Sequence, residues 1–277
     1  MNGPARLNLS ILSLLALPAM RTIAVAIFSL LGMAAITPAT SAELDVLSPT
    51  ALRSSMQELI PQFEGSSGHK LKVGFGPAGA LARRIQQGEV LDVGIVTDAQ
   101  IDNLQKQGKI VAGSKTIIAR VGVGVFVRKG AAKPDIRSVE AFKRALLAAK
   151  SIGHFDPAGG APSGIFAARL LSSLGIGAEL KQKIKVYPPG RSIYAAIAEG
   201  EIEIGLGQIT EIVTQPTAQL VGPLPAEIQN YTLFAAGIAT VSKTQDAAKS
   251  LIDFLTSAAA ARVMKAKGLE KYVGGVR

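Results

Sequence analysis

Cysteine and tryptophan are both absent from the 277-residue chain, and histidine occurs only twice, at His69 and His154. Without cysteine there is no disulfide, no thiolate metal site and no thiol nucleophile. Two histidines are too few for a His-rich zinc site, although a site made of carboxylates alone is not excluded by composition. We therefore expect neither a metal nor a cofactor.

Aromatic and charged residues are also scarce, at 5% and 18% of the chain. Few aromatics and no dense run of Lys and Arg argue against a groove that stacks nucleic-acid bases, so no nucleic-acid partner is expected. The 30 Lys and Arg against 20 Asp and Glu still leave a net charge of +10. Such a basic balance either favours a small anionic ligand or only sets solubility.

Residues 1–42 have the features of a secretory signal peptide. They contain no acidic residue, Arg21 precedes a short apolar run at 23–36, and the small residues Thr-Ser-Ala stand at 40–42. The run is shorter than the ~20 residues that cross a bilayer, so a membrane anchor is only the alternative. We predict cleavage after about Ala42 and a periplasmic mature chain, with Met20 as an alternative start of translation.

The hydrophobic share of 48% excludes a disordered chain and predicts a sizeable core. After residue 43, short apolar strand patterns alternate with helical patterns, which favours parallel sheets covered on both faces. Two longer strand patterns, at 117–127 and 231–239, lie far apart in the sequence. They predict two crossings between a pair of lobes.

The predicted fold class is therefore α/β with two lobes. Lobe 1 is expected at 43–120 plus 236–277, and lobe 2 at 121–235. The hinge crossings are expected near 118–127 and 223–236.

Several predicted strands end in a turn of small residues that opens a helix. These turns lie at 48–51, 76–79, 159–164 and 188–192. Small residues let an oxyanion approach free backbone N–H groups, and a helix N-terminus carries positive partial charge. One such turn is ordinary loop chemistry, but four in one chain favour an anion cleft at the strand ends.

Motifs of common catalytic sites are missing. The sequence has no dinucleotide fingerprint, no phosphate-binding P-loop and no nucleophile elbow. A Ser-His-Asp triad cannot be assembled convincingly from two histidines. Binding is therefore a better-supported function than catalysis.

Several stretches of the mature chain match a known pattern. They are LDVLSPTAL at 44–52, FGPAGALARRIQQG at 75–88, LDV at 91–93, DPAGG at 156–160, EGE at 199–201 and FLTS at 254–257. Together they resemble the molybdate-type periplasmic solute-binding proteins over nearly the whole mature chain. The resemblance implies a type II periplasmic binding fold, with mixed sheets flanked by helices and a ligand cleft between the lobes. It also implies a monomer that delivers its ligand to a membrane ABC permease.

The resemblance places the oxyanion-holding positions on Ala51 and Ala78, where the metal-oxyanion binders usually present serine hydroxyls. Two hydroxyl donors are therefore missing, and each hydrogen bond to a charged group contributes about 1.5–3 kcal/mol. This departure predicts an organic di- or tricarboxylate as the ligand rather than molybdate.

Eleven residues at or near the turns are candidate ligand contacts. They are Thr50, Ala51, Pro77, Ala78, Gly79, Ser163, Gly164, Arg191, Ser192, Tyr194 and Gln208. Arg191 would match a carboxylate with its planar fork, and Thr50 would replace the hydroxyl missing at Ala51. Tyr194 and Gln208 are either further donors or lobe packing. Arg83 and Arg84 point to different sides of a helix, so at most one should face the cleft, and a solvated helix face is their ordinary role.

The alternative is an enzyme on the same fold. This branch of the family also resembles aconitate isomerase, which moves a proton along a tricarboxylate and needs a base near the substrate carbon. His154 and Asp156, at the end of a strand beside a glycine turn, are the base candidates. Their ordinary roles are a buried edge histidine and a turn former.

Overall fold

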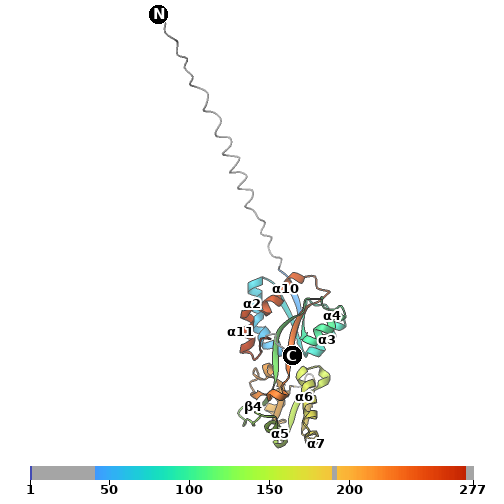
Figure 1. The fold of residues 1–277 in the computed structure, drawn as a ribbon, viewed down its shortest axis with the longest axis vertical. Helices are drawn as coiled ribbons and strands as arrows, with labels where there is room; N and C mark the ends of the chain where they lie inside the picture. Colours follow the sequence, from blue (N-terminus) through green and yellow to red (C-terminus); the bar gives the residue numbers. More distant parts are fainter. Residues whose placement is uncertain (2–40, 189–191, 273–277) are drawn as a thin grey trace. The chain divides into compact units, whose positions relative to one another are not determined.

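The computed structural model describes Met1, residues 41–188 and residues 192–272 (Figure 1). Contacts divide the chain between residues 40 and 41, and the part from Ser41 onward is described here by itself. Nearly all of the expected signal peptide, and also Arg191, lie outside the described residues. No helix within the described ranges is both long and apolar enough to cross a membrane.

Nine strands of the described chain form one mixed sheet in the order β2-β1-β3-β9-β4-β7-β5-β6, with β8 paired to β4. The strands are β1 (Glu43–Pro49), β2 (Lys70–Gly76), β3 (Val93–Thr97), β4 (Thr116–Arg128), β5 (Ile152–Phe155), β6 (Ile184–Tyr187), β7 (Ile204–Gln208), β8 (Ala218–Pro223) and β9 (Tyr231–Ile238).

The sheet is parallel where strand and helix alternate and antiparallel where the chain crosses between its halves. β1 pairs in parallel with β2 and β3, and β5 pairs in parallel with β6 and β7. β4 and β9 run antiparallel to each other and to their other neighbours. The expectation of parallel sheets is thus wrong for these two strands, because the chain leaves the first half on β4 and returns on β9.

Helices cover both faces of the sheet. They are α2 (Arg53–Ser67), α3 (Ala78–Gln86), α4 (Asp98–Lys106), α5 (Val139–Ala148), α6 (Pro162–Ser173), α7 (Gly177–Leu180), α8 (Ile193–Ala198), α9 (Ile209–Ile212), α10 (Gln245–Leu255) and α11 (Ala258–Ala266), with 3-10 turns η1 (Thr50–Leu52), η2 (Pro157–Gly159) and η3 (Ala226–Ile228). The predicted α/β class, a mixed sheet with flanking helices, is confirmed.

Lobe 1 has a core on each face of its part of the sheet. On one face, α2, α10 and α11 pack on β1, β3 and β9, with Phe63 and Leu251 buried between them. On the other face, α3 and α4 cover the sheet with Leu81, Ile85 and Ile101. Figure 1 shows these two groups of helices on opposite sides of the strands. Both faces are therefore withdrawn from water, as parallel strands require.

Lobe 2 repeats this arrangement on the other half of the sheet. Phe142 of α5 and Leu171 of α6 enter the core on one face. Ile193 and Ile197 of α8 join Phe126 of β4 in the core on the other face. Alternate residues of β4 thus serve opposite faces, which is the period-2 pattern of a strand.

The cores change from one lobe to the other on the two crossing segments. On β4, Val121 belongs to the core of lobe 1 and Val123 to that of lobe 2. On the return, Leu224 is the last member of the lobe 2 core and Phe234 rejoins lobe 1. The boundaries at 120/121 and 235/236 are close to these positions and stay a prediction.

Candidate functional site

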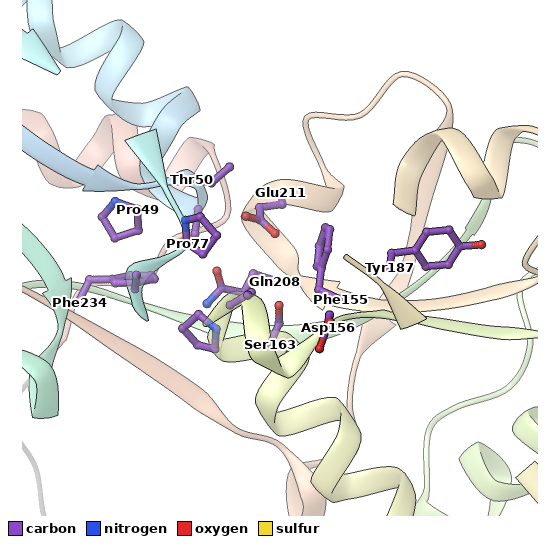
Figure 2. Close-up of a pocket in the computed structure, with 15 residues that line it drawn as sticks. Pro49, Thr50, Pro77, Phe155, Asp156, Ser163, Tyr187, Gln208, Glu211 and Phe234 are labelled. Carbon is purple, nitrogen blue, oxygen red and sulfur yellow. The ribbon is translucent and has the colours of Figure 1, made fainter. Parts of the chain in front are cut away.

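A cavity of about 220 Å³ lies where the two lobes meet. Residues of both lobes line it (Figure 2), namely Pro49, Thr50, Ala51, Pro77, Ala78 and Phe234 of lobe 1 and Phe155, Asp156, Gly159, Ala161, Pro162, Ser163, Tyr187, Gln208 and Glu211 of lobe 2. Most of them follow the C-terminal ends of β1, β2, β5 and β7. This edge is where open α/β sheets place their ligands.

Four helical segments begin at this cavity without a side-chain cap. Their N-cap residues are Pro49 for η1, Pro77 for α3, Ala161 for α6 and Gln208 for α9, and each lines the cavity. Proline and alanine have no side-chain acceptor for the first-turn N–H groups. First-turn N–H groups have no partner inside the helix either, so those that no other group accepts are available to a guest in the cavity. The Gly79 N–H of α3 is not among them, because it donates to the Gly160 carbonyl.

Helices that begin elsewhere show the contrast. Ser138, Ser192 and Ser257 cap α5, α8 and α11 by accepting a hydrogen bond from the backbone N–H three residues on, at 3.1, 3.3 and 3.2 Å. A serine cap contributes about 1 kcal/mol to a helix. The chain thus has this device and lacks it at these four starts, although Asp156, which also lines the cavity, caps η2. Helices α2, α7 and α10, which begin outside the cavity lining, also lack a side-chain cap.

Two glycines bring the lobes into direct contact beside the cavity. The Gly79 N–H donates to the Gly160 carbonyl at 3.0 Å. A Cβ on Gly79 would lie 2.9 Å from the Gly160 Cα and carbonyl oxygen, and Gly160 itself has φ 78°. The Gly79 amide thus joins the lobes, and the expected contact of Gly79 with the ligand stays a prediction.

Six of the expected contact residues line the cavity, namely Thr50, Ala51, Pro77, Ala78, Ser163 and Gln208. Gly164 does not, since its Cα is pressed against β5, where a Cβ would lie 2.5 Å from the Phe155 carbonyl oxygen. Ser192 is an exposed cap of α8, and Tyr194 lines a neighbouring cavity. Arg191 lies outside the described residues.

The arginines of α3 do not reach the site. Neither Arg83 nor Arg84 lines the cavity, and both are exposed. Arg84 forms an ion pair with Glu89, which raises the pKa of its guanidinium. Both arginines thus occupy the solvated helix face that is their ordinary role.

The two base candidates lie in different places. His154 is 3% exposed, and its Nδ1 is 2.8 Å from the Phe155 carbonyl oxygen, away from the cavity lining. His154 is thus buried and is not part of this lining, and its role as a base stays a prediction. Asp156 does line the cavity, and its Oδ1 also accepts a hydrogen bond from the Ala158 N–H at 2.9 Å.

Gln208 brings an unpaired donor to the cavity. Its side chain is 3% exposed, and its Nε2 has no hydrogen-bond partner among the described groups. Figure 2 shows the amide directed into the space between the lobes. Because an unsatisfied buried donor costs about 1–3 kcal/mol, a guest that accepts this hydrogen bond gains affinity.

Glu211 is a titratable residue of the cavity lining that the sequence analysis missed. It stands on α9, is partly buried, and directs its carboxylate into the same space (Figure 2). Burial raises the pKa of this carboxyl to about 7, and the positive charge of Arg53 acts in the opposite direction. Its one sequence signal is an acidic residue in the first turn after a strand end.

The fold places a cavity between two α/β lobes, and the N-caps of four helical segments line it. This is the architecture of a two-lobed periplasmic binding protein. The chain belongs to the bacterial extracellular solute-binding protein family, whose model matches residues 44–270.

Relatives with different activities share this fold. The chain is 28% identical over 233 residues to an aconitate isomerase of a Pseudomonas species, covering 82% of this chain and 87% of that protein. It is 29% identical over 237 residues to the molybdate-binding protein ModA of Azotobacter vinelandii, covering 83% and 90%. The solved periplasmic molybdate-binding protein of Azotobacter vinelandii superposes with a TM-score of 0.69 at 21% identity, over 83% of this chain and 100% of that one.

Proposed function

We propose that this chain is the periplasmic solute-binding protein of an ABC importer and that it carries a small organic anion, a di- or tricarboxylate. The observation that carries the proposal is the set of uncapped helix starts around one cavity. The protein acts as a monomer that hands its ligand to a membrane permease.

Donors from both lobes would hold the ligand. The first-turn N–H groups of Ala78 on α3 and Ser163 on α6 face a carboxylate from opposite lobes, and the Gln208 amide adds a third donor. Each such bond to a charged group contributes about 1.5–3 kcal/mol. Because one ligand contacts both lobes, it stabilises the closed form, which is the form that the permease recognises.

The cavity suits an organic anion better than a metal oxyanion. Ala51 and Ala78 offer no hydroxyl to a compact oxyanion. Phe155, Phe234 and Pro162 provide apolar surface for a carbon skeleton. An oxyanion has no carbon atoms with which to use that surface.

A melting experiment tests the proposal. Molybdate, tungstate, sulfate, citrate and both aconitate isomers are added separately, and only the carboxylates are expected to raise the melting temperature. Gln208→Leu removes the unpaired donor at similar volume and should weaken carboxylate binding about tenfold. If none of these anions raises the melting temperature, the proposal fails.

An isomerase is the second candidate, favoured by the similarity to aconitate isomerase and by Glu211. A carboxyl with a pKa of about 7 at the ligand is poised to take and return a proton near neutral pH. The protein is incubated at high concentration with trans-aconitate, and the proton NMR spectrum is followed. Conversion that is lost in Glu211→Gln supports an enzyme, and no conversion removes this candidate.

A further inference from the structure

A second cavity, of about 380 Å³, adjoins the first. Thr50, Phe155 and Glu211 line both cavities and form their common wall. The other residues that line the second cavity are Arg53, Ser54, Gln57, Tyr194, Thr210, Thr214 and Gln215. This second space is therefore also built by both lobes.

Two hydroxyls at this second cavity are buried without a partner. Tyr194 is 7% exposed and Thr210 is 1% exposed, and neither hydroxyl forms a hydrogen bond with any described group. The Tyr194 ring is fixed by Phe126 and Phe155, with ring centroids 5.1 and 6.2 Å away. Buried polar groups normally have partners, so these two hydroxyls indicate a guest that supplies acceptors.

A cation without an ion-pair partner completes the set. The Arg53 guanidinium stacks over the Phe75 ring at 4.4 Å from its centroid. Within the described ranges it has no carboxylate closer than 4.0 Å, although Glu211 stands across the cavity. The contact with the Phe75 ring fixes the orientation of the Arg53 guanidinium. The N–H groups at the edge of the guanidinium can then donate to a planar acceptor such as a carboxylate.

We propose that Arg53, Tyr194 and Thr210 form a second subsite for the far carboxylate of an elongated organic dianion. This inference rests on the proposed function, because the near carboxylate is held at the helix starts of the first cavity. The carbon chain passes Phe155 on the common wall. Neutral Glu211 donates to the ligand there, whereas ionised Glu211 repels it.

Ligands of matched length test the second subsite by titration calorimetry of the mature protein at pH 6. Glutarate and valerate both have five carbons but carry two carboxylates and one, respectively. Glutarate is expected to bind about tenfold or more tightly than valerate. Citrate and succinate report whether branching or a shorter chain is accepted.

Variants test whether the preference for glutarate over valerate depends on Arg53, Tyr194 and Thr210. Arg53→Gln, Tyr194→Phe and Thr210→Val should each lower glutarate affinity about tenfold and leave valerate affinity unchanged. Arg83→Gln is the matched control, since it removes the same charge from an exposed residue that lines neither cavity. Tyr194→Phe and Thr210→Val should not lower the melting temperature, because each removes an unpaired buried hydroxyl.

The outcomes separate the two proposals. If neither glutarate, citrate nor valerate binds, the proposed function and the second subsite both fail. If glutarate and valerate bind equally well, or if Arg53→Gln behaves as Arg83→Gln does, the second subsite is wrong and the proposed function stands.

Discussion

In the proposed function, Glu211 is expected to make ligand binding sensitive to pH. Burial raises the pKa of its carboxyl to about 7 from an ordinary value of 4.5, against the pull of Arg53. The other titratable groups that line the two cavities with it, besides Arg53, are Tyr187, Tyr194 and Asp156, and burial also holds the pKa of the Tyr194 phenol well above its ordinary range. Near neutral pH, Glu211 is thus the group whose charge changes.

The direction of the pH dependence of ligand affinity follows from the negative charge of the ligand. An anion binds best while Glu211 is protonated, so affinity should be constant well below pH 7 and fall as the pH rises through 7 and beyond. Dissociation constants for glutarate or citrate measured between pH 5.5 and 8.5 check this. Glu211→Gln should flatten the curve and bind more tightly than wild type at pH 8.5, and the idea is wrong if both proteins give parallel curves.

Ala51 and Ala78 are the residues that set the ligand class in this account. The double substitution Ala51→Ser and Ala78→Ser restores two hydroxyl donors at the cavity. Since each bond to a charged group contributes about 1.5–3 kcal/mol, molybdate affinity should rise by about tenfold or more. Calorimetry with Ala80→Ser as the control, on α3 but outside the cavity lining, measures the change. An unchanged molybdate affinity in the double variant would contradict the assignment.

At the scale of elements, the strand-turn-helix pattern could be predicted because it depends only on residues that are close together in the sequence. Small residues after an apolar strand predicted turns at 76–79 and 159–164 that open helices, and the structure begins α3 at Ala78 and α6 at Pro162, within those turns. β8 was not predicted, because Ala218–Pro223 alternates weakly and pairs with β4 some ninety residues earlier in the chain. The antiparallel directions of β4 and β9 are likewise set by distant pairing.

Only part of the candidate site could be predicted from the sequence, because some of its residues come together only through contacts between distant segments. Gln208 was found because it lies in the turn after a predicted strand at 202–206, where ligands lie in such sheets. Arg53 and Glu211 lie far apart in the sequence and acquire a role only when the lobes face each other across a shared space. Helical periodicity predicts that these two residues lie in helices. It does not predict that their side chains line the same cavity.

In the proposed mechanism, closure depends on the backbone contact between Gly79 of α3 and Gly160, the residue after η2, because neither residue has a side chain. Gly79→Ala places a Cβ 2.9 Å from the Gly160 backbone, so the lobes cannot approach as closely. Ligand affinity should fall about tenfold or more, while the melting temperature of the free protein changes little. Gly65→Ala is the control, because a Cβ there meets no atom within 4 Å. Gly79→Ala binding as tightly as wild type would show that this contact is dispensable.

At the scale of the whole molecule, the main feature is that the two lobes have separate apolar cores. Each lobe has its own apolar core on both faces of its half of the sheet, and β4 and β9 join the halves. In the proposed function, relative movement of the lobes would leave both cores intact, and a guest that contacts both lobes would shift the molecule toward the closed form. One ligand must then act on donors of both lobes together.

Backbone amide NMR during a ligand titration tests this central claim most directly. The account predicts that the N–H signals of Ala78 in lobe 1 and Ser163 in lobe 2 shift together and saturate at the same carboxylate concentration. A carboxylate that binds tightly while both of these signals stay in place would contradict the account.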